Sequence, residues 1–469
     1  MLGGSGWSRT APAVPTRPRI APRAAVIAGL LALGLGAGGE ARANGRFPAS
    51  NAVIFSPANP DHVMVRVTFG LLATRDAGKS WRWICERAIG FSGLEDPSYT
   101  VTKTGTIVAG LFEGIRVSRD GGCTWDAVST AGFTVFIDTT LRADGAVFAL
   151  ASAYDKQGDA GILFKSQLFV SHDDAKTFEK VGDLLDPTLL AESVEVSASD
   201  PSRVYISAVR GDSGPRQGVL LVSNDGGKKW IERKITPPTP GGAHDGGKSG
   251  ELAPFIAGVD PLKADRVYIR TSASPENPTR LLVTDDAGKT FRTLVSAKGP
   301  LLGFALAADG KTVAAGGPDD GLFGGAFDAK ELTQTSALKV QCLGRGGAGH
   351  DLWACSNEAS GFVAGSSSDD GAKFVPRLHL ADISGALACQ PGTGVAKDCE
   401  ADWPKMQSQM GFMPEAKTTA GAPDAGPTPD PKTRTPAKPA STSSTWLYVV
   451  LAVLGLLTGT YVAKRKKSK

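Results

Sequence analysis

Ser118-Arg119-Asp120-Gly121-Gly122-Cys123-Thr124-Trp125 is the clearest copy of an eight-residue motif that occurs six times in this chain of 469 residues. The other copies lie at residues 74–81, 171–178, 223–230, 284–291 and 367–374. Every copy has Ser or Thr first, Asp third and Trp or Phe eighth, and five of the six have Gly fifth, the exception being Ala175. The chain is therefore built from repeats of one structural unit.

The residue types of the motif are those of a tight turn between two strands. An Asp side chain accepts hydrogen bonds from the backbone N–H groups of its own turn, and Ser or Thr does so more weakly. Gly supplies the positive φ of a tight hairpin, and the closing aromatic is a large apolar anchor. We predict a structural role for the third and eighth positions, which are Asp76, Asp120, Asp173, Asp225, Asp286 and Asp369, and Trp81, Trp125, Phe178, Trp230, Phe291 and Phe374.

The motif resembles the Asp-box (BNR) repeat, S/T-x-D-x-G-x-T-W/F, of sialidases, sortilin-type receptors and photosystem II assembly factors. The resemblance recurs over residues 74–374. It implies an all-β fold, a β-propeller with the motifs on hairpins at the outer rim of its blades. It implies no single function, because these families do unrelated things.

The spacing of the copies predicts the number of blades. The copies begin at positions 74, 118, 171, 223, 284 and 367, so the first five follow one another at intervals close to one propeller repeat and the last interval is about two units. The missing copy is expected near residues 321–325, where an apolar lead-in survives without the Asp. Turns at Asn59-Pro60, Asp200-Pro201 and Asp260-Pro261 should join the first and second strands of blades, because Pro is excluded from central strands. We predict a seven-bladed propeller over residues 44–380.

The N-terminus has the layout of a secretory signal. Arg residues precede an apolar run at 24–38, and Ala41-Arg42-Ala43 offers an A-x-A cleavage site. A first transmembrane helix is the competing interpretation, which the short, Gly-rich run disfavours. We predict a signal peptide at residues 1–43 and export of the rest.

The C-terminus is expected to anchor the protein in a membrane. Residues 414–445 contain seven Pro and are typical of an extended linker. Residues 446–463 carry no formal charge and are about long enough to span a bilayer, and the basic tail at 464–469 should stay cytoplasmic. The alternative is a C-terminal sorting signal that is removed after export. We predict a bacterial-type cell membrane, with the propeller on its periplasmic or extracellular side.

Six cysteines in an exported chain favour disulfides over metal ligands. Cys342 and Cys355 flank a Gly-rich turn and could face each other on paired strands. Cys389 and Cys399 close a short loop in a Cys-containing extension at residues 381–413, which leaves Cys85 to pair with Cys123. Six cysteines allow fifteen pairings, so this scheme is a preference. No CxxC pair and no HExxH occurs, so no metal or cofactor is predicted.

Two patterns suggest ligands that their context disfavours. Residues 242–249 fit the phosphate-binding pattern G-x-x-x-x-G-K-S, but Pro-rich sequence on both sides replaces the strand and helix that such a loop needs. The doublets Asp173-Asp174, Asp285-Asp286 and Asp369-Asp370 could suggest Ca²⁺, which takes six or more oxygen ligands. We predict surface turns at these doublets.

The charge distribution disfavours nucleic acid as a partner. The chain carries a net +4, of which residues 1–43 contribute +4 and residues 464–469 contribute +5, so the part between them carries −5. A mildly acidic exterior is expected to bind a protein or a glycan instead. Because each blade must pack on its neighbours, the ring should fold as one monomeric domain.

The predicted function is that of a non-catalytic binding, adhesion or assembly module. The longest loop between blades, residues 236–254, is polar and Gly-rich, and long loops inside compact domains are often functional. We expect it to overhang the binding face, with His244, Asp245, Lys248 and Glu251 as candidate ligand contacts.

The alternative is a sialidase-like exo-glycosidase. That family clamps a carboxylate with three Arg and uses a Tyr nucleophile assisted by Glu, with an Asp acid/base. Arg46-Phe47-Pro48 partly matches the Arg-Ile-Pro that precedes the first repeat in sialidases. No motif places two further Arg or a Tyr–Glu pair, and Tyr205 and Tyr268 lie in predicted inner strands, where a packing role is expected.

Overall fold

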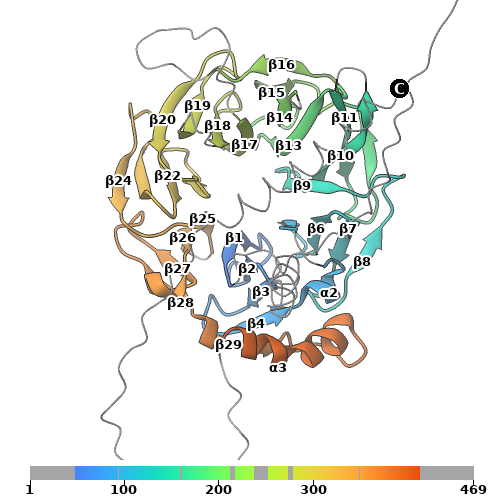
Figure 1. The fold of residues 1–469 in the computed structure, drawn as a ribbon, viewed down its shortest axis with the longest axis vertical. Helices are drawn as coiled ribbons and strands as arrows, with labels where there is room; N and C mark the ends of the chain where they lie inside the picture. The colour runs from blue at the N-terminus through green and yellow to red at the C-terminus, as the bar shows by residue number, and fades with distance from the viewer. Residues whose placement is uncertain are drawn as a thin grey trace, which may run out of the picture. The chain divides into compact units, whose positions relative to one another are not determined.

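The fold is a ring of seven β-sheets. The computed structural model describes residues 48–92, 95–158, 161–211, 217–236, 252–272, 278–347 and 349–411. Within these residues each blade is a sheet of four strands that follow one another in sequence, and blade 1 has a fifth strand (Figure 1). The predicted all-β, seven-bladed propeller is confirmed.

The strands of each blade pair antiparallel in the order of the chain. Blade 1 contains β1 (Ser50–Phe55), β2 (Val63–Val67), β3 (Gly70–Thr74) and β4 (Trp81–Ile84); blade 2 contains β5 (Ser98–Val101), β6 (Ile107–Leu111), β7 (Gly114–Ser118) and β8 (Asp126–Val128); blade 3 contains β9 (Phe136–Leu141), β10 (Val147–Gly158), β11 (Gly161–Ser171) and β12 (Glu179–Val181). Blade 4 contains β13 (Leu189–Val196), β14 (Val204–Arg210), β15 (Gln217–Ser223) and β16 (Ile231–Lys234); blade 5 contains β17 (Leu252–Val259), β18 (Val267–Ser272), β19 (Thr279–Thr284) and β20 (Arg292–Ala297). Blade 6 contains β21 (Gly303–Leu306), β22 (Thr312–Gly317), β23 (Gly321–Ala326) and β24 (Thr333–Ser336); blade 7 contains β25 (Cys342–Gly346), β26 (Asp351–Cys355), β27 (Ala364–Ser367) and β28 (Val375–Leu378).

The first strands of the blades surround the axis. Each of them contacts the first strands of both neighbouring blades, so seven strand edges face the centre. The turns at Asn59-Pro60, Asp200-Pro201 and Asp260-Pro261 join first and second strands, as predicted. Second strands form the packed interior of the blades, and in β14 the side chains of Val204 and Tyr205 are fully buried.

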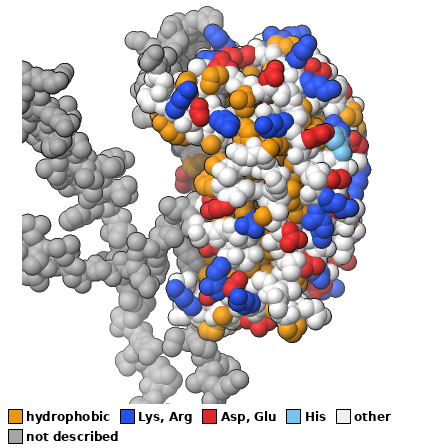
Figure 2. All heavy atoms as spheres, turned by 90° about the vertical axis from the view of Figure 1, so that its right-hand side faces the viewer, with side chains coloured by type: hydrophobic (Ala, Val, Ile, Leu, Met, Phe, Trp, Pro, Cys, Tyr) orange, Lys and Arg blue, Asp and Glu red, His pale blue; other side chains and the backbone are white. Residues whose placement is uncertain are grey.

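The outer rim carries the motifs. Each of the six copies connects the third and fourth strands of its blade. Blade 6 has no copy, and β23 lies where the missing one was expected. On the side of the ring that contains β8 and β11, basic and acidic side chains are interspersed (Figure 2).

The chain closes the ring by returning to blade 1 after blade 7 is complete. We call residues 383–409 the strap. It begins with β29 (Ile383–Ala386), which pairs parallel with β4 and lies outside it (Figure 1). A π-helix, η3 (Val395–Cys399), and the helix α3 (Glu400–Gln409) follow. The short helices α2 (Glu86–Ile89), η1 (Glu358–Ser360) and η2 (Leu380–Asp382) complete the secondary structure of the described residues.

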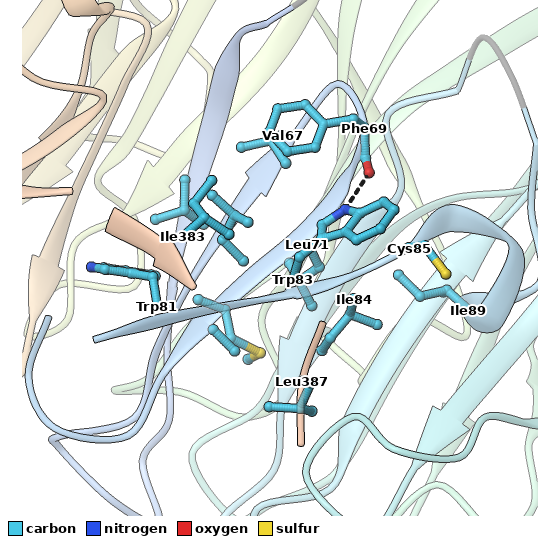
Figure 3. Packing of buried hydrophobic residues seen from close by; sticks show 14 of the residues in the cluster. Val67, Phe69, Leu71, Trp81, Trp83, Ile84, Cys85, Ile89, Ile383 and Leu387 are labelled. Atoms are coloured by element: carbon cyan, nitrogen blue, oxygen red, sulfur yellow. Dashed lines mark hydrogen bonds between the residues drawn. The ribbon is translucent and has the colours of Figure 1, made fainter. Parts of the chain in front are cut away.

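The strap covers a large apolar cluster of blade 1. Trp81, Trp83 and Ile84 lie on β4, and Ile383 and Leu387 of the strap pack over them (Figure 3). The Trp83 indole N–H donates to the carbonyl of Phe69 at 2.7 Å, so this buried polar atom is satisfied. Burying an apolar side chain of this size stabilises the fold by about 1.5–3 kcal/mol, so the strap contributes substantially to the stability of blade 1.

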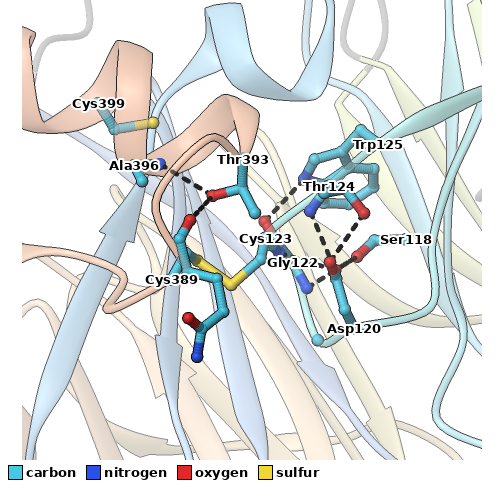
Figure 4. The surroundings of a disulfide bond; sticks show 12 residues. Ser118, Asp120, Gly122, Cys123, Thr124, Trp125, Cys389, Thr393, Ala396 and Cys399 are labelled. Atoms are coloured by element: carbon cyan, nitrogen blue, oxygen red, sulfur yellow. Dashed lines mark hydrogen bonds between the residues drawn. A yellow bond between two sulfur atoms is a disulfide. The ribbon is translucent and has the colours of Figure 1, made fainter.

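The disulfides correct part of the predicted pairing. Cys342 bonds to Cys355 across β25 and β26, as predicted. The predicted pairs Cys389–Cys399 and Cys85–Cys123 are wrong. Cys85 bonds to Cys399 over a separation of 314 residues. Cys123 bonds to Cys389 over a separation of 266 residues (Figure 4). The reason is tertiary: the strap lies against blades 1 and 2, so its cysteines face theirs rather than each other.

Several predicted segments lie outside the described residues. They are the signal peptide at 1–43, the linker at 414–445, the membrane helix at 446–463, the tail at 464–469 and the phosphate-loop-like residues 242–249. In the part of the chain that the structure does describe, we find no helix with the length and apolar character needed to cross a membrane.

Candidate functional site

The aspartate of each motif is held by its own turn. In blade 2, Asp120 Oδ1 accepts from the backbone N–H groups of Cys123 and Thr124, both at 3.0 Å, and from the hydroxyl of Ser118 at 2.9 Å (Figure 4). Asp120 Oδ2 accepts from the Thr124 hydroxyl at 2.7 Å. Both carboxylate oxygens therefore already have partners within the motif itself.

The other motifs repeat this network and keep their carboxylates charged. A hydrogen bond from the Ser80 hydroxyl is the main cause that lowers the pKa of Asp76 to about 2. Burial alone would raise the pKa of Asp173, but hydrogen bonds from Thr177 and Ser171 lower it to about 2. These aspartates act as acceptors for their turns.

The fifth residue of the motif packs on the preceding blade. Gly122 has φ of 106°, and a Cβ there would lie 2.5 Å from Ile84 of blade 1. Ala175 occupies this position in blade 3 with φ of 59° and is fully buried. The motif therefore joins blades as well as turning the chain.

A candidate site outside the motifs lies on the axis of the ring. A cavity of about 770 Å³ opens at the N-terminal ends of the first strands, and a second of about 850 Å³ opens at their C-terminal ends. The two share the lining residues Val53, Ile54, Tyr99 and Thr139, so they meet inside the ring. We call them together the axial cavity.

Along one side of the axis, side chains of one blade accept hydrogen bonds from the backbone N–H groups of first strands in the next. The Thr139 N–H of blade 3 donates to Ser98 Oγ of blade 2 at 2.9 Å, and the Val194 N–H of blade 4 donates to Asp138 Oδ2 at 2.9 Å. The Ile256 N–H of blade 5 donates to Ser193 Oγ at 2.9 Å. An unpaired strand edge exposes such N–H groups. We call Ser98, Asp138 and Ser193 the polar wall, which joins blades 2 to 5.

Two carboxyl groups near the polar wall have raised pKa values. Each residue keeps some exposure to the axial cavity, but its carboxyl group is enclosed by the surrounding strands. Burial raises the pKa of Asp138 to about 6, against hydrogen bonds from the Val194 N–H and the Ser98 hydroxyl that lower it. Burial and then the nearby charge of Asp138 raise the pKa of Glu195 to about 8. The Thr140 hydroxyl donates to Glu195 Oε2 at 2.8 Å.

On the opposite side of the axis, first strands of neighbouring blades are joined by close packing of side chains against glycines. A Cβ at Gly258 of blade 5 would lie 3.1 Å from the Phe304 ring of blade 6. A Cβ at Gly344 of blade 7 would lie 2.7 Å from Val53 Cγ1 of blade 1. We call Gly258, Phe304, Gly344 and Val53 the apolar wall. Because glycine has no side chain, an apolar side chain of the neighbouring blade can pack directly against its backbone.

The arginines at the cavity serve the fold. Arg66 Nε donates to Asn51 Oδ1 at 2.7 Å, and Arg66 Nη1 donates to the carbonyl of Pro97 at 2.7 Å. Arg270 Nη1 donates to the carbonyl of Leu301 at 2.9 Å, and its guanidinium lies 5.1 Å from the centre of the Phe255 ring.

Tyr205 and Tyr268, the tyrosines considered for a sialidase site, are buried, whereas Tyr99 lines the axial cavity. Tyr205 is fully buried and donates to the carbonyl of Ala264 at 2.7 Å, and Tyr268 is fully buried as well. Tyr99 lines the axial cavity, and its buried hydroxyl has no hydrogen-bond partner among the described residues. Among these three tyrosines, only Tyr99 lines the axial cavity, and its hydroxyl is enclosed by the protein.

The acidic doublets have partners in the protein. Asp174 accepts from the hydroxyls of Thr102, Thr104 and Thr106 of blade 2. Asp285 accepts from Arg266 Nε at 2.6 Å, and Asp370 pairs with Arg345. Within the described ranges no group of three or more His, Cys, Asp or Glu side chains could hold a metal ion.

The sequence prediction missed the axial residues. The predicted contacts His244, Asp245, Lys248 and Glu251 lie outside the described residues, as do Arg46 and Phe47. Asp138, Ser193 and Glu195 belong to no motif, and their strands β9 and β13 contain other polar residues as well. No sequence signal therefore distinguishes them.

Comparisons with known proteins concern the fold. No protein family matches the sequence, and no curated protein does either. Among solved structures, an ancestral GH74 enzyme is 12% identical with a TM-score of 0.49, over 71% of this chain and 46% of that one. A Hadza microbial sialidase is 16% identical with a TM-score of 0.38, over 58% of this chain and 62% of that one.

YCF48 bound to D1 peptide is 15% identical with a TM-score of 0.33, over 53% of this chain and 67% of that one. The chain spans less than half the length of the GH74 enzyme. By its own sheet topology the protein is a seven-bladed β-propeller, and its structural neighbours include GH74, sialidase and YCF48 propellers.

Proposed function

We propose that the protein is an exported, membrane-anchored propeller that acts as a non-catalytic binding, adhesion or assembly module and holds a protein or glycan in its axial cavity. The observation behind this proposal is that three charged residues of the cavity are held by hydrogen bonds within the fold. Asp138 accepts three hydrogen bonds, and Arg66 and Arg270 donate to backbone carbonyls. Groups held in this way provide a rigid surface for recognition.

The mouth at the N-terminal ends of the first strands favours a ligand with apolar faces. Phe255 and Leu302 line it and remain 39% and 41% exposed. An exposed aromatic ring suits the face of a sugar or an apolar side chain. On the side of the ring in Figure 2, basic and acidic side chains are interspersed, which supports a partner other than nucleic acid.

Export is supported by the cysteines and by the termini. All six cysteines form disulfides, which persist in oxidising compartments. The predicted signal peptide at 1–43 and the apolar stretch at 446–463 would place the propeller outside a membrane and tether it there. The anchor rests on the sequence alone.

The test is a binding screen with matched variants. We would screen the purified full chain in detergent micelles against glycan arrays and envelope peptides, and measure the affinity of each hit. Phe255→Ala should weaken binding about tenfold or more, because a central aromatic contact is worth about 1.5 kcal/mol or more. Leu262→Ala is the control, since Leu262 is 69% exposed in the turn after β17 and does not line the cavity. Equal affinities for both variants would refute the axial site.

A sialidase-like exo-glycosidase is the second candidate. The observation in its favour is that Tyr99 lines both cavities on the axis, with Asp138 lining one and Glu195 the other, and that both of these acidic residues have raised pKa values. Hydrolysis of a fluorogenic sialoside by the wild-type chain, abolished in Tyr99→Phe and Glu195→Gln, would establish the enzyme. If no hydrolysis is detected between pH 4 and 8, the sialidase candidate is refuted and the non-catalytic binding module is retained.

A further inference from the structure

The disulfides of this protein are nested along the chain. In order of sequence the cysteines are Cys85, Cys123, Cys342, Cys355, Cys389 and Cys399. The first bonds to the sixth, the second to the fifth and the third to the fourth. Only the third and fourth are neighbours, so two of the three bonds join cysteines that other cysteines separate.

Both long-range bonds depend on the strap. Cys85 follows β4, and its N–H lies 3.0 Å from Sγ of Cys399 at the end of η3. Cys123 lies in the motif turn of blade 2 (Figure 4). The N–H of Val395 donates to the Cys123 carbonyl at 3.4 Å. The strap follows all seven blades in the chain and docks on blades 1 and 2. The native partners of Cys85 and Cys123 are thus the last cysteines to become available.

In the unfolded chain, Cys85 should form a non-native disulfide with Cys123 more often than its native disulfide with Cys399. Cys85 and Cys399 are separated by 314 residues, whereas the segment between Cys85 and Cys123 is about eight times shorter. Because loop closure becomes less probable with length to the power of about three halves, Cys85 meets Cys123 roughly 20 times more often than it meets Cys399 in an unfolded chain. An oxidant acting as the chain emerges would therefore trap Cys85–Cys123, and later Cys389–Cys399.

We propose that a thiol–disulfide isomerase is a required folding partner of this protein. The inference rests on the proposed export, since the bonds must form in an oxidising compartment. The partner is identified by its chemistry: a reactive thiolate that attacks a mispaired disulfide and leaves unchanged at the end.

The exchange balances without an added oxidant. The isomerase thiolate attacks Sγ of Cys85 in the Cys85–Cys123 bond, forms a mixed disulfide and releases the Cys123 thiolate. That thiolate attacks Sγ of Cys389 in the Cys389–Cys399 bond, forms Cys123–Cys389 and releases the Cys399 thiolate. Cys399 then attacks Sγ of Cys85 in the mixed disulfide, forms Cys85–Cys399 and regenerates the isomerase thiolate. Two disulfides are consumed and two are formed.

The test in cells contains its own control. The full chain is exported into the periplasm of a bacterial host with or without its disulfide isomerase, thiols are blocked, and the bonds are mapped by non-reducing peptide mass spectrometry. Without the isomerase, Cys85–Cys399 and Cys123–Cys389 should fall at least fivefold in yield, with Cys85–Cys123 appearing in their place. Cys342–Cys355 joins neighbouring cysteines and should form equally in both hosts. Equal yields of all three bonds would overturn the proposal.

A refolding experiment separates this proposal from the proposed function and location. The reduced full chain is refolded in a glutathione buffer with a purified isomerase or with its active-site Cys→Ser variant. We expect the nested bonds to form at least fivefold faster with the active isomerase. A chain with Cys85→Ser, Cys123→Ser, Cys389→Ser and Cys399→Ser should form Cys342–Cys355 at the same rate in both mixtures. No rate difference for the wild-type chain would refute the partner whatever ligand the propeller binds.

Discussion

Aspartates at the rim and on the axis of this propeller have opposite properties. Asp120 at the rim accepts all its hydrogen bonds from within one motif turn, whereas Asp138 accepts from its own strand, from blade 2 and from blade 4. The rim turns lower the pKa of their carboxyls, and the enclosed axis raises it. The difference shows that the same residue type stabilises a turn in one place and a contact between blades in the other.

The largest effect should follow from removing the axial carboxyl. Asp138→Ala leaves the Val194 N–H without its partner inside the ring, where an unsatisfied donor costs about 1–3 kcal/mol, and also loses the link to Ser98. We expect a loss of about 3 kcal/mol in the free energy of unfolding, measured by urea denaturation. Asp126→Ala, at an exposed position of β8, is the control and should leave the free energy of unfolding nearly unchanged, as surface substitutions outside such networks usually do.

The equivalent change at the rim should cost less. In Asp120→Ala the freed N–H groups of Cys123 and Thr124 are exposed, so water can replace the carboxylate. We expect a loss of about 1 kcal/mol by the same urea measurement, with ligand binding retained. A cost greater than that of Asp138→Ala would show that the distinction between rim and axis is wrong.

The stability of the protein should change with pH in opposite directions for the carboxyls on the axis and those at the rim. Glu195 has a pKa of about 8 when folded against an ordinary value of 4.5, so the folded state holds its proton longer and stability falls as pH rises from about 4.5 to 8. Asp76 has a pKa of about 2 against an ordinary value of 3.8, so its contribution is present above about pH 4 and is lost as pH falls toward 2. Melting temperatures from pH 2 to 9 would show both limbs.

Two variants test which residue causes the loss of stability at neutral pH and which causes the loss at acid pH. Glu195→Gln should flatten the loss of stability between pH 5 and 8 and leave the acid limb unchanged. Asp76→Asn should do the reverse. If Glu195→Gln steepened the neutral limb, the raised pKa of this carboxyl would be refuted.

The smallest effect is expected where one motif departs from the others. Ala175→Gly relieves the cost of a positive φ, about 1 kcal/mol, but removes a buried methyl group worth about 0.8 kcal/mol. The two contributions nearly cancel, so the net change in the free energy of unfolding by urea denaturation should be smaller than either of them. Gly122→Ala is the contrasting variant, because its Cβ would overlap Ile84, and it should destabilise clearly.

The residues explain why some features were predictable and others were not. Asp120 and Trp125 indicate a turn because every interaction that defines the motif is local, and six copies give the period of the blades. Asp138 gives no such signal, since its partners Ser98 and Val194 are 40 and 56 residues away and meet it only when three blades have assembled. The predicted cysteine pairs fail for the same reason, because neighbours along the chain were paired where the strap brings distant ones together.

Residue types and their spacing were enough to predict the all-β class, the seven blades, the place of the missing motif and the Cys342–Cys355 bond. Each follows from hydrogen bonds, turns or strand pairs between residues close together in the chain, which residue type and spacing specify. The polar and apolar walls around the axis, the strap over blade 1 and the nested disulfides became apparent only in the folded protein. These contacts exist because the ring closes, and closure places side by side residues whose separation along the chain carries no mark in the sequence.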